Sequence, residues 1–482
     1  MIDVRPVGYV IGLLVAVFGV SMLIPMSVEY SSGSGFGDVF AQSAFLSILI
    51  GGLTALACAN AVRERLSLQQ TFLITSTVWL ILPIFGALPF LYGPTAATVT
   101  DAFFEAMSGM TTTGATAFPN LEEQPPGILL WRSMLQWFGG IGIIVFAMVF
   151  LPELRVGGMQ IFRSEAFDTA GKVLPRAAEI ASRISIVYLG LTVACAVAYM
   201  GVGLSFFDAV NHAMTTLATG GFSTKDTSFA GLPPAASYVG VAFMVLASLP
   251  FVRFVQLLAG SVEPMWRDSQ IRAFLAVLFG AIITVALLRA LGQGTAFEPA
   301  FRDSLFNITS IMTGTGYASA DYQLWGGFPV ALIFFLGLVG GCAGSTCCSA
   351  KIFRYQILVA AIRTQVRRIH SPHGIFQTKF EGRTVTEDVI SSVMAFFTLF
   401  FVSIGVLAVL LAGTGLDLVT SLSGSVAAIA NIGPGLGDII GPAGNYAAVN
   451  DVAKWLLAAG MLIGRLELLA VFVIFTRRFW AA

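Results

Sequence analysis

The sequence predicts an all-α polytopic membrane protein, and three observations support this fold class. Of the 482 residues, 56% are hydrophobic and 11% are charged, whereas a soluble domain carries roughly 25% charged residues. Several apolar runs exceed the ~20 residues that a helix needs to cross a bilayer. Shorter apolar segments, too short to cross, recur between these runs. Together these features exclude a soluble enzyme, a secreted module and a disordered chain.

Ten apolar runs are candidate spans. They lie near 8–26, 39–60, 71–91, 128–151, 184–204, 236–260, 272–292, 328–360, 390–412 and 452–476. The first run lacks a small-residue cleavage site, so we interpret it as a retained helix and not as a signal peptide. The five cysteines lie in or beside apolar segments and do not resemble a secreted disulfide framework.

The basic residues predict the orientation of the chain. Nineteen of the 26 lysines and arginines fall in the set of loops that also contains both termini. Because basic loops stay on the cytoplasmic side, we expect both termini to be cytoplasmic. The opposite loops are rich in Asp and Glu, which would attract cations to an external mouth. The simpler alternative is that charge sorting alone left these acids outside.

Four short apolar segments form an internal repeat. Each opens with an aspartate and runs for about three helical turns before a break rich in Thr and Gly. The aspartates are Asp101, Asp208, Asp303 and Asp417, and the breaks centre on Gly114, Gly220, Gly316 and Gly433, separated by 106, 96 and 117 residues. Such a period fits one span, one re-entrant half-helix and one further span, repeated around a pseudo-fourfold axis.

The chemistry of this unit favours a cation pore. An aspartate at the start of a short helix stabilises its N-terminus, so the C-terminal end points toward the membrane centre. Non-helical backbone at that depth must line a water-filled cavity or be buried in protein. Glycine allows successive carbonyls to face an axis, and four such loops can replace the hydration shell of K⁺. The alternative, helix packing through small residues, would place the glycines inside long spans.

Longer motifs resemble a known family. TTTGAT, ATGGFST, TGTGY and NIGPGLG, together with FFEAMSGMTTTGAT and WRSMLQWFGGIGIIVFAMVFLPELRVGGMQ, are similar to the Trk/Ktr/HKT superfamily of potassium transporters. Within it the chain resembles the TrkH-type membrane subunit over essentially its whole length. The resemblance implies four membrane–pore–membrane repeats after two N-terminal transmembrane helices. The corresponding boundaries are 1–66 for the two helices, then 67–160, 161–266, 267–370 and 371–482 for the repeats.

The resemblance also implies a K⁺ filter. Its residues are Thr112, Thr113 and Gly114; Ala218, Thr219 and Gly220; Gly314, Thr315 and Gly316; and Asn431, Ile432 and Gly433. A serine in place of the first-loop glycine accompanies Na⁺ transport in this superfamily, so Gly114 favours K⁺. Potassium is then the transported ion, and no organic cofactor is expected.

The eighth span is interrupted by GGCAGSTCCSAK, from Gly340 to Lys351. Small residues inside a span destabilise helix and permit a loop within the membrane. By resemblance this loop blocks the pore below the filter and moves on gating, which assigns a gating role to Gly340, Gly341, Cys342, Ala343, Gly344, Ser345 and Thr346. Cys347, Cys348 and Ser349 replace glycines that are common in the family. A metal site at Cys342, Cys347 and Cys348 is an alternative to inert buried thiols.

Arg465 lies within the last predicted span. A buried arginine costs about 2.5–3.5 kcal/mol on insertion scales, so it needs a cavity and a partner. By resemblance it reaches into the pore and contacts the intramembrane loop, where its charge opposes cations. Glu467 lies on a different helix face and is a poor partner. Snorkelling to the cytoplasmic surface is the alternative. For Arg253 we expect a structural partner on another helix.

Partners follow mostly from the resemblance, which implies a homodimer and a cytosolic ring of nucleotide-binding regulatory subunits (RCK type, TrkA-like). The basic loops 155–183 and 361–385 are the natural docking surface. No nucleotide-binding, zinc or hydrolase motif is visible, so we expect no enzymatic activity, and a net charge of zero gives no reason to expect nucleic acid. Membrane lipid is the remaining partner. We interpret His212 as a helix-packing residue, and His370 and His373 as a solvated hinge.

These inferences predict K⁺ uptake through a carbonyl filter gated by an intramembrane loop and a cytosolic partner. A K⁺ symporter coupled to H⁺ or Na⁺ is the alternative, although no chain of ionisable residues is seen crossing the membrane. A membrane-embedded enzyme is a third hypothesis, which the lack of clustered catalytic carboxylates or histidines disfavours.

Overall fold

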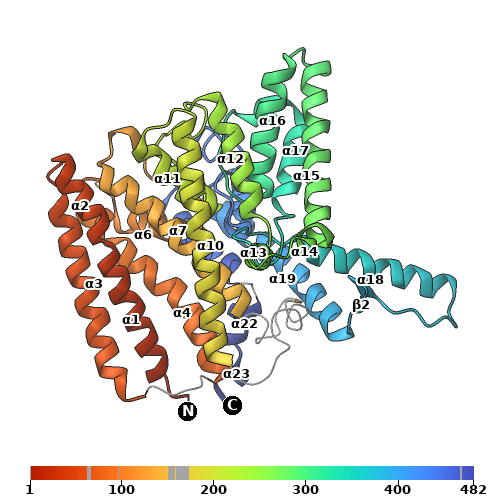
Figure 1. The fold of residues 1–482 in the computed structure, drawn as a ribbon, viewed down its shortest axis with the longest axis horizontal. Coiled ribbons are helices and arrows are strands. Elements are labelled where there is room, and N and C mark those ends of the chain that lie inside the picture. Colours follow the sequence, from red (N-terminus) through yellow and green to blue (C-terminus); the bar gives the residue numbers. More distant parts are fainter. Residues whose placement is uncertain are drawn as a thin grey trace.

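The computed structural model describes residues 2–61, 67–95, 97–149, 158, 173–466 and 469–481. These residues are mostly helical (Figure 1), which confirms the predicted fold class. Within this part of the chain the only strands are β1 (Lys379–Phe380) and β2 (Arg383–Thr384), which pair as a small antiparallel hairpin.

Seven helical segments are long and apolar enough to cross a membrane. They are Arg5–Ser32, Gly37–Cys58, Gln69–Tyr92, Pro126–Val145, Ala181–Gly201, Ser269–Gly292 and Glu387–Gly413. They belong to helices α1 (Arg5–Ser21) and α2 (Leu23–Ser32), α3 (Gly37–Cys58), α4 (Leu68–Gly86) and α5 (Leu88–Tyr92), α7 (Pro126–Val149), α10 (Val173–Gly201), α15 (Ser269–Leu287) with the π-helical turn η4 (Leu288–Gly292), and α19 (Glu387–Gly413).

The remaining predicted spans are not continuous helices. Run 236–260 is a pair, α12 (Pro234–Ala247) and α13 (Phe251–Leu258), bent by 89°. Pro250 sits at this bend as the residue before α13, where its ring cannot continue the preceding helix. Run 452–476 comprises α21 (Asp451–Arg465) and the short α22 (Leu469–Ile474), separated in part by residues outside the described chain. By length and composition, seven or eight helices among the described residues could cross, instead of ten.

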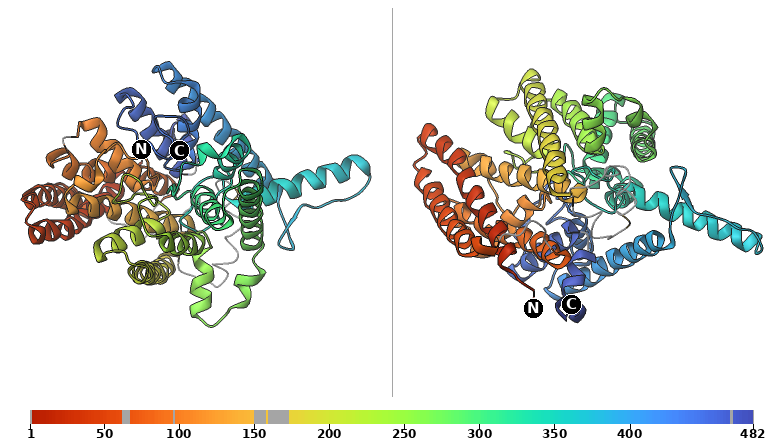
Figure 2. Two further views of the ribbon diagram at one scale, coloured as in Figure 1. Left: turned by 90° about the horizontal axis from the view of Figure 1, so that it is seen from above. Right: turned by 60° about the horizontal axis from the view of Figure 1, so that its bottom comes forward.

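The predicted interruption of the eighth span is present. Helix α17 (Gly327–Gly337) ends before the glycine- and cysteine-rich segment, and α18 (Ile352–His370) begins after it, leaving 338–351 non-helical. Beyond this break α18 and the β-hairpin project away from the other helices, as Figures 1 and 2 show. Run 328–360 is therefore a short apolar helix and a loop, and its last nine residues belong to the projecting helix.

Helices α1 and α3 pack against each other through glycines. A β-carbon built on Gly12 would lie 2.6 Å from the carbonyl oxygen of Gly51, and one built on Gly51 would lie 2.6 Å from that of Gly12. Small residues are what allow helix backbones in a membrane to approach so closely. Gly52, next in the chain, has no atom within 4 Å of its β-carbon position.

We expect Gly51→Val to lower the free energy of unfolding by about 1–3 kcal/mol, the usual cost of overpacking. Gly52→Val is the matched control, because it adds the same side chain one residue away in open space. Thermal unfolding of both variants in detergent checks this expectation. Equal melting temperatures for the two variants would show that the helix contact does not depend on Gly51.

Four short helices lie between the longer ones: α6 (Val99–Met110), α11 (Phe206–Leu217), α16 (Phe297–Met312) and α20 (Leu418–Ala430). Asp417 caps α20 directly by accepting hydrogen bonds from the backbone N–H groups of Val419 and Thr420. Asp101 and Asp208 lie in the first turns of α6 and α11, whose caps are the hydroxyls of Thr98 and Ser205.

Asp303 departs from the predicted pattern. It lies in the second turn of α16, which begins at Phe297 and has no side-chain cap. Its carboxylate instead pairs with Arg289 at an Nη2–Oδ2 distance of 3.4 Å. The sequence interpretation missed the extra first turn, since that turn starts at neither a capping residue nor an aspartate.

The termini lie near one another at the same end of the molecule (Figure 1). Which side of a membrane this end faces stays a prediction. The remaining elements are the short helices η1 (Ala59–Ala61), η2 (Leu121–Glu123), α14 (Glu263–Arg267), η5 (Tyr322–Trp325) and α23 (Arg477–Ala481).

Candidate functional site

The loops that follow the four short helices meet one another in a closed ring. The contacts appear when a β-carbon is built on a glycine of each loop. The β-carbon of the first loop approaches the second loop, that of the second approaches the third, that of the third approaches the fourth, and that of the fourth approaches the first. These contacts are Gly114 to the oxygen of Gly220 (2.1 Å), Gly221 to the oxygen of Thr315 (2.0 Å), Gly316 to the nitrogen of Gly433 (2.8 Å) and Gly433 to the oxygen of Gly114 (3.0 Å).

Backbone conformation gives the register of the loops. The first loop has positive φ at Thr112 and Gly114, with angles of 52° and 86°. The same spacing recurs in the second and third loops, at Thr219 and Gly221 and at Gly314 and Gly316. In the fourth loop, positive φ is found at Asn431 but not at Gly433. Positive φ is the left-handed region that favours glycine. It turns the chain at the same two steps of the first three breaks, and at the first of these steps in the fourth break.

In the second loop this register differs from the predicted filter set by one residue. The N–H groups of Thr113 and Gly220 each donate to the carbonyl five residues earlier, so these two residues correspond. The counterpart of Gly114 is then Gly221, which the sequence interpretation missed, whereas Ala218 is the C-cap of α11. The doublet Gly220–Gly221 was the available signal, because either glycine could have filled the position.

The ring opens into a pocket of about 120 Å³, which one glycine from each loop lines: Gly114, Gly221, Gly316 and Gly433. Arg132, Lys225 and Asp226 contribute charged groups to the same pocket. Gly220 does not line it. The carbonyl of Gly220 instead accepts a hydrogen bond from Nε2 of Gln136 at 2.6 Å.

Side chains behind the ring hold the first two loops together. Glu105 and Arg132 form an ion pair at an Nε–Oε1 distance of 2.8 Å, with both side chains at most 1% exposed. The carboxylate of Glu105 also accepts from the hydroxyl of Thr116 and the N–H of Ala117, both in the first loop. Arg132 donates in turn to the carbonyl of Ser223, just after the second loop, at 2.9 Å. A charge pair that is buried and fully hydrogen-bonded rigidifies its surroundings.

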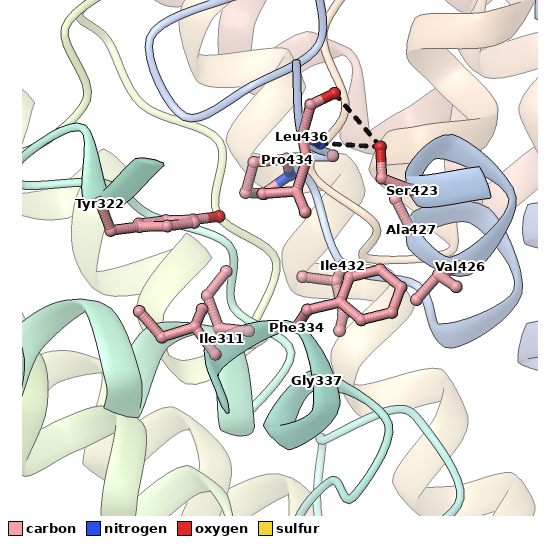
Figure 3. Close-up of a pocket in the computed structure, with 12 residues that line it drawn as sticks. Ile311, Tyr322, Phe334, Gly337, Ser423, Val426, Ala427, Ile432, Pro434 and Leu436 are labelled. Carbon is pink, nitrogen blue, oxygen red and sulfur yellow. Dashed lines mark hydrogen bonds between the residues drawn. The ribbon is translucent and has the colours of Figure 1, made fainter. Parts of the chain in front are cut away.

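An apolar pocket beside the fourth loop contains the Ile432 side chain. Figure 3 shows Ile432 near Phe334 and Ile311, and a β-carbon on Gly337 would lie 2.9 Å from Cδ1 of Ile432. In the same view, Ser423 accepts from the N–H of Leu436 at 2.8 Å and donates to its carbonyl. The surroundings are apolar apart from this hydroxyl and that of Tyr322, so the pocket anchors the loop and does not resemble an ion site.

The non-helical segment 338–351 is buried against the α12–α13 junction. All seven residues from Gly340 to Thr346 to which the sequence assigns a gating role are buried. The N–H groups of Cys342 and Thr346 donate to the carbonyls of Ser248 and Ala247, and the carbonyl of Gly344 accepts from Phe251. The bend between α12 and α13 thus leaves carbonyl groups without helical partners, and the N–H groups of this segment donate hydrogen bonds to them.

Arg465 lies against the same segment. Its side chain is buried, with Nη1 donating to Sγ of Cys348 at 2.6 Å and Nη2 donating to the carbonyl of Gly139 on α7 at 3.0 Å. The structure therefore does not support the snorkelling alternative. Glu467 lies outside the described residues.

The other residues that the sequence singled out have structural surroundings. Arg253 pairs with Asp268 at 2.9 Å, the interhelical partner that was expected. His212 is buried, with its ring nitrogens 2.8 Å from the carbonyl of Asp208 and 3.0 Å from the hydroxyl of Ser223. His370 and His373 are exposed. Across the described ranges, no three His, Cys, Asp or Glu side chains group as metal ligands, so the three-cysteine site is not assembled.

Comparisons with known proteins cover nearly the whole chain. The model of the TrkH family, described as a cation transport protein, matches residues 37–480. The chain is 40% identical over 479 residues to the Trk system potassium uptake protein TrkI of Halomonas elongata, covering 98% of this chain and 96% of the relative. It is 36% identical over 485 residues to TrkH of Escherichia coli K12, covering 99% of each. The crystal structure of the potassium transporter TrkH from Vibrio parahaemolyticus matches with a TM-score of 0.92 and 34% identity, covering 99% of this chain and 100% of that one.

Proposed function

The chain belongs to the TrkH family of cation transport proteins, a family of multi-pass membrane proteins, and on that basis we propose that it takes up potassium through the ring of four loops. The observation that carries this proposal is the single pocket lined by one glycine from each loop. Left-handed residues at corresponding steps of the four breaks turn the backbone groups toward one axis. Backbone carbonyls arranged in this way replace the water around K⁺.

The proposed filter keeps the predicted residues in the first, third and fourth loops. These are Thr112, Thr113 and Gly114; Gly314, Thr315 and Gly316; and Asn431, Ile432 and Gly433. In the second loop the register favours Thr219, Gly220 and Gly221. The repeat boundaries at 67–160, 161–266, 267–370 and 371–482 belong to the same proposal.

We expect Gly114→Ser and Gly221→Ser to reduce the preference for K⁺ over Na⁺. Each added β-carbon would lie about 2 Å from a carbonyl oxygen of the neighbouring loop, and each glycine has a positive φ that a side chain strains. The ring must then widen or distort. Competition of Na⁺ with ⁸⁶Rb⁺ uptake into liposomes measures the preference. Gly190→Ser, which meets no atom within 4 Å, is the control.

The proposed gate is segment 338–351 together with Arg465. A buried guanidinium beneath a ring of carbonyls raises the energy of a cation at that point, since charge interactions are strong in a low-dielectric interior. Flux requires that the segment or the arginine moves. Hydrogen bonds attach this segment to the α12–α13 junction, which we take as the part of the gate that stays in place.

Uptake of ⁸⁶Rb⁺ into liposomes, with and without a pH or Na⁺ gradient, tests passive conduction against coupled symport. Passive conduction predicts flux that follows the K⁺ gradient alone. Flux driven uphill by either gradient would support the symporter alternative, which no observation among the described residues favours. An absence of ⁸⁶Rb⁺ uptake under every condition would contradict potassium transport itself.

The proposed assembly is a homodimer in the bacterial cytoplasmic membrane, with both termini cytoplasmic and a cytosolic nucleotide-binding ring as partner. Basic loops provide the docking surface, although most of 155–183 lies outside the described residues. The later loop includes the end of α18, with Arg363, Arg367 and Arg368 exposed. Those charges favour an acidic partner surface.

Because the sequence carries no nucleotide-binding motif, we expect ATP and ADP to change flux only when a separate cytosolic subunit is present. ⁸⁶Rb⁺ uptake by the purified chain, with each nucleotide and without, checks this expectation. A nucleotide effect on the chain by itself would place the regulatory site in this protein.

A further inference from the structure

A tyrosine hydroxyl binds the backbone carbonyl of Gly433 in the fourth loop. The hydroxyl of Tyr446 donates to this carbonyl oxygen at 3.0 Å. Both residues line the pocket into which the ring of loops opens. Gly433 is the glycine that the fourth loop contributes to this pocket, so the hydrogen bond belongs to the wall of the proposed pore entrance.

The backbone of the fourth loop differs from that of the other three. The pocket-lining glycines of the first three loops have positive φ, whereas Gly433 does not. Pro434 follows Gly433, and a proline ring restricts the residue before it to extended conformations. The second left-handed step of the other loops is therefore missing here, and the hydroxyl of Tyr446 supplies a different restraint on the Gly433 carbonyl.

Tyr446 is itself held in place on several sides. Its side chain is 3% exposed, and its ring lies against that of Phe104 on α6, with centroids 5.4 Å apart. Its backbone N–H donates to the carbonyl of Thr116 in the first loop at 2.8 Å. The hydroxyl of Thr116 donates in turn to Glu105, a member of the buried ion pair described above. Tyr446 therefore links the fourth loop to the first through a rigid framework.

We propose that Tyr446 is a specificity-determining residue, which positions the Gly433 carbonyl so that the pore favours K⁺ over Na⁺. The inference rests on the proposed function of the ring. Selectivity of a carbonyl filter depends on the spacing of its oxygens and on the strength of their dipoles. The hydrogen bond restrains the oxygen and draws electron density from it, so the field at the ion is weaker. Without this bond the oxygen moves closer to the smaller Na⁺ and binds it more strongly.

Tyr446→Phe tests the proposal, because it removes the hydroxyl and keeps the ring. The matched control is Tyr188→Phe. The hydroxyl of Tyr188 also donates to a backbone carbonyl, that of Trp137 on α7 at 3.2 Å, and its side chain is fully buried. The control therefore deletes a bond of the same kind outside the four loops.

The measured quantity is the ratio of the Na⁺ and K⁺ concentrations that each halve ⁸⁶Rb⁺ uptake into liposomes. We expect this ratio to fall about three- to tenfold in Tyr446→Phe and to stay at the wild-type value in Tyr188→Phe; tenfold corresponds to about 1.4 kcal/mol. A loss of folded protein lowers the uptake of every ion alike and leaves the ratio unchanged. An unchanged ratio in Tyr446→Phe, or a wild type without preference for K⁺, overturns the proposal.

A second measurement separates this inference from the proposed function. Ions that bind the folded chain raise its melting temperature, which is recorded on purified protein in detergent, where no transport is needed. We expect the ratio of Na⁺ to K⁺ concentrations needed for half of the stabilisation to fall in Tyr446→Phe and not in Tyr188→Phe. If this shift is found while the wild type takes up no ⁸⁶Rb⁺, potassium transport is contradicted and the positioning role of Tyr446 stands. An equal ratio in all three proteins, or no stabilisation of the wild type by K⁺, refutes the role.

Discussion

Arg465→Ala is expected to raise K⁺ flux about ten- to a hundredfold in the absence of any partner or nucleotide, which corresponds to about 1.4–2.8 kcal/mol of barrier. The guanidinium is buried against segment 338–351 and donates to Sγ of Cys348 and to the carbonyl of Gly139. Its removal deletes a fixed positive charge from the path of a cation and releases the segment that contains Cys348. ⁸⁶Rb⁺ uptake into liposomes at matched protein content measures the change.

Two further variants sharpen this prediction. Arg465→Lys keeps the charge but loses the fork that reaches both acceptors, so we expect a smaller increase. Deleting 343–345 shortens the gate and should raise flux as well. Combining the deletion with Arg465→Ala should add less than the sum, because both changes act on one barrier. A fall in flux for Arg465→Ala, in protein that remains folded, would show that the arginine is structural.

Arg132→Met is expected to lower the free energy of unfolding by about 3–5 kcal/mol and to abolish selective uptake. The change leaves the carboxylate of Glu105 buried without its charged partner. It also removes the donor to the carbonyl of Ser223, so the link between the first and second loops is lost. Thermal unfolding and ⁸⁶Rb⁺ uptake of the same preparation measure the two effects.

The control for Arg132 is a more exposed ion pair in the same chain. Arg302 and Glu298 lie 2.8 Å apart on α16, with side chains 22% and 58% exposed. Arg302→Met should cost only about 0–1 kcal/mol, since solvent screens exposed pairs. The double variant Glu105→Gln/Arg132→Met should recover part of the lost stability, because no charge then remains buried alone. If Arg132→Met unfolds no more easily than Arg302→Met, the buried pair does not hold the loops.

Local features of the sequence predicted the four breaks and the interruption of the eighth predicted span. The four breaks were visible because Thr- and Gly-rich runs follow short apolar segments at regular spacing, and three of these segments begin close to an aspartate. The interruption after Gly337 was visible for the same reason, since glycine and small residues destabilise a helix wherever they stand. Asp303 shows where this kind of prediction fails. The first turn of α16 has no capping residue, so the local sequence does not indicate where the helix begins.

Contacts between segments that are distant in the chain could not be predicted from the sequence. The choice between Gly220 and Gly221 depends on which of two adjacent glycines approaches the third loop, 94 residues along the chain at Thr315. The partner of Arg132 likewise became evident only when α6 and α7 packed together.

By itself the sequence determined that this is a helical membrane protein with four breaks after short helices, because hydropathy, glycine and proline act on the residues beside them. Only the tertiary structure decided that Gly221 faces the pocket and that Cys348, not Cys347, contacts Arg465. Adjacent side chains on a non-helical segment point in different directions, and the direction of each is set by the helices that pack around it. No local pattern records that packing.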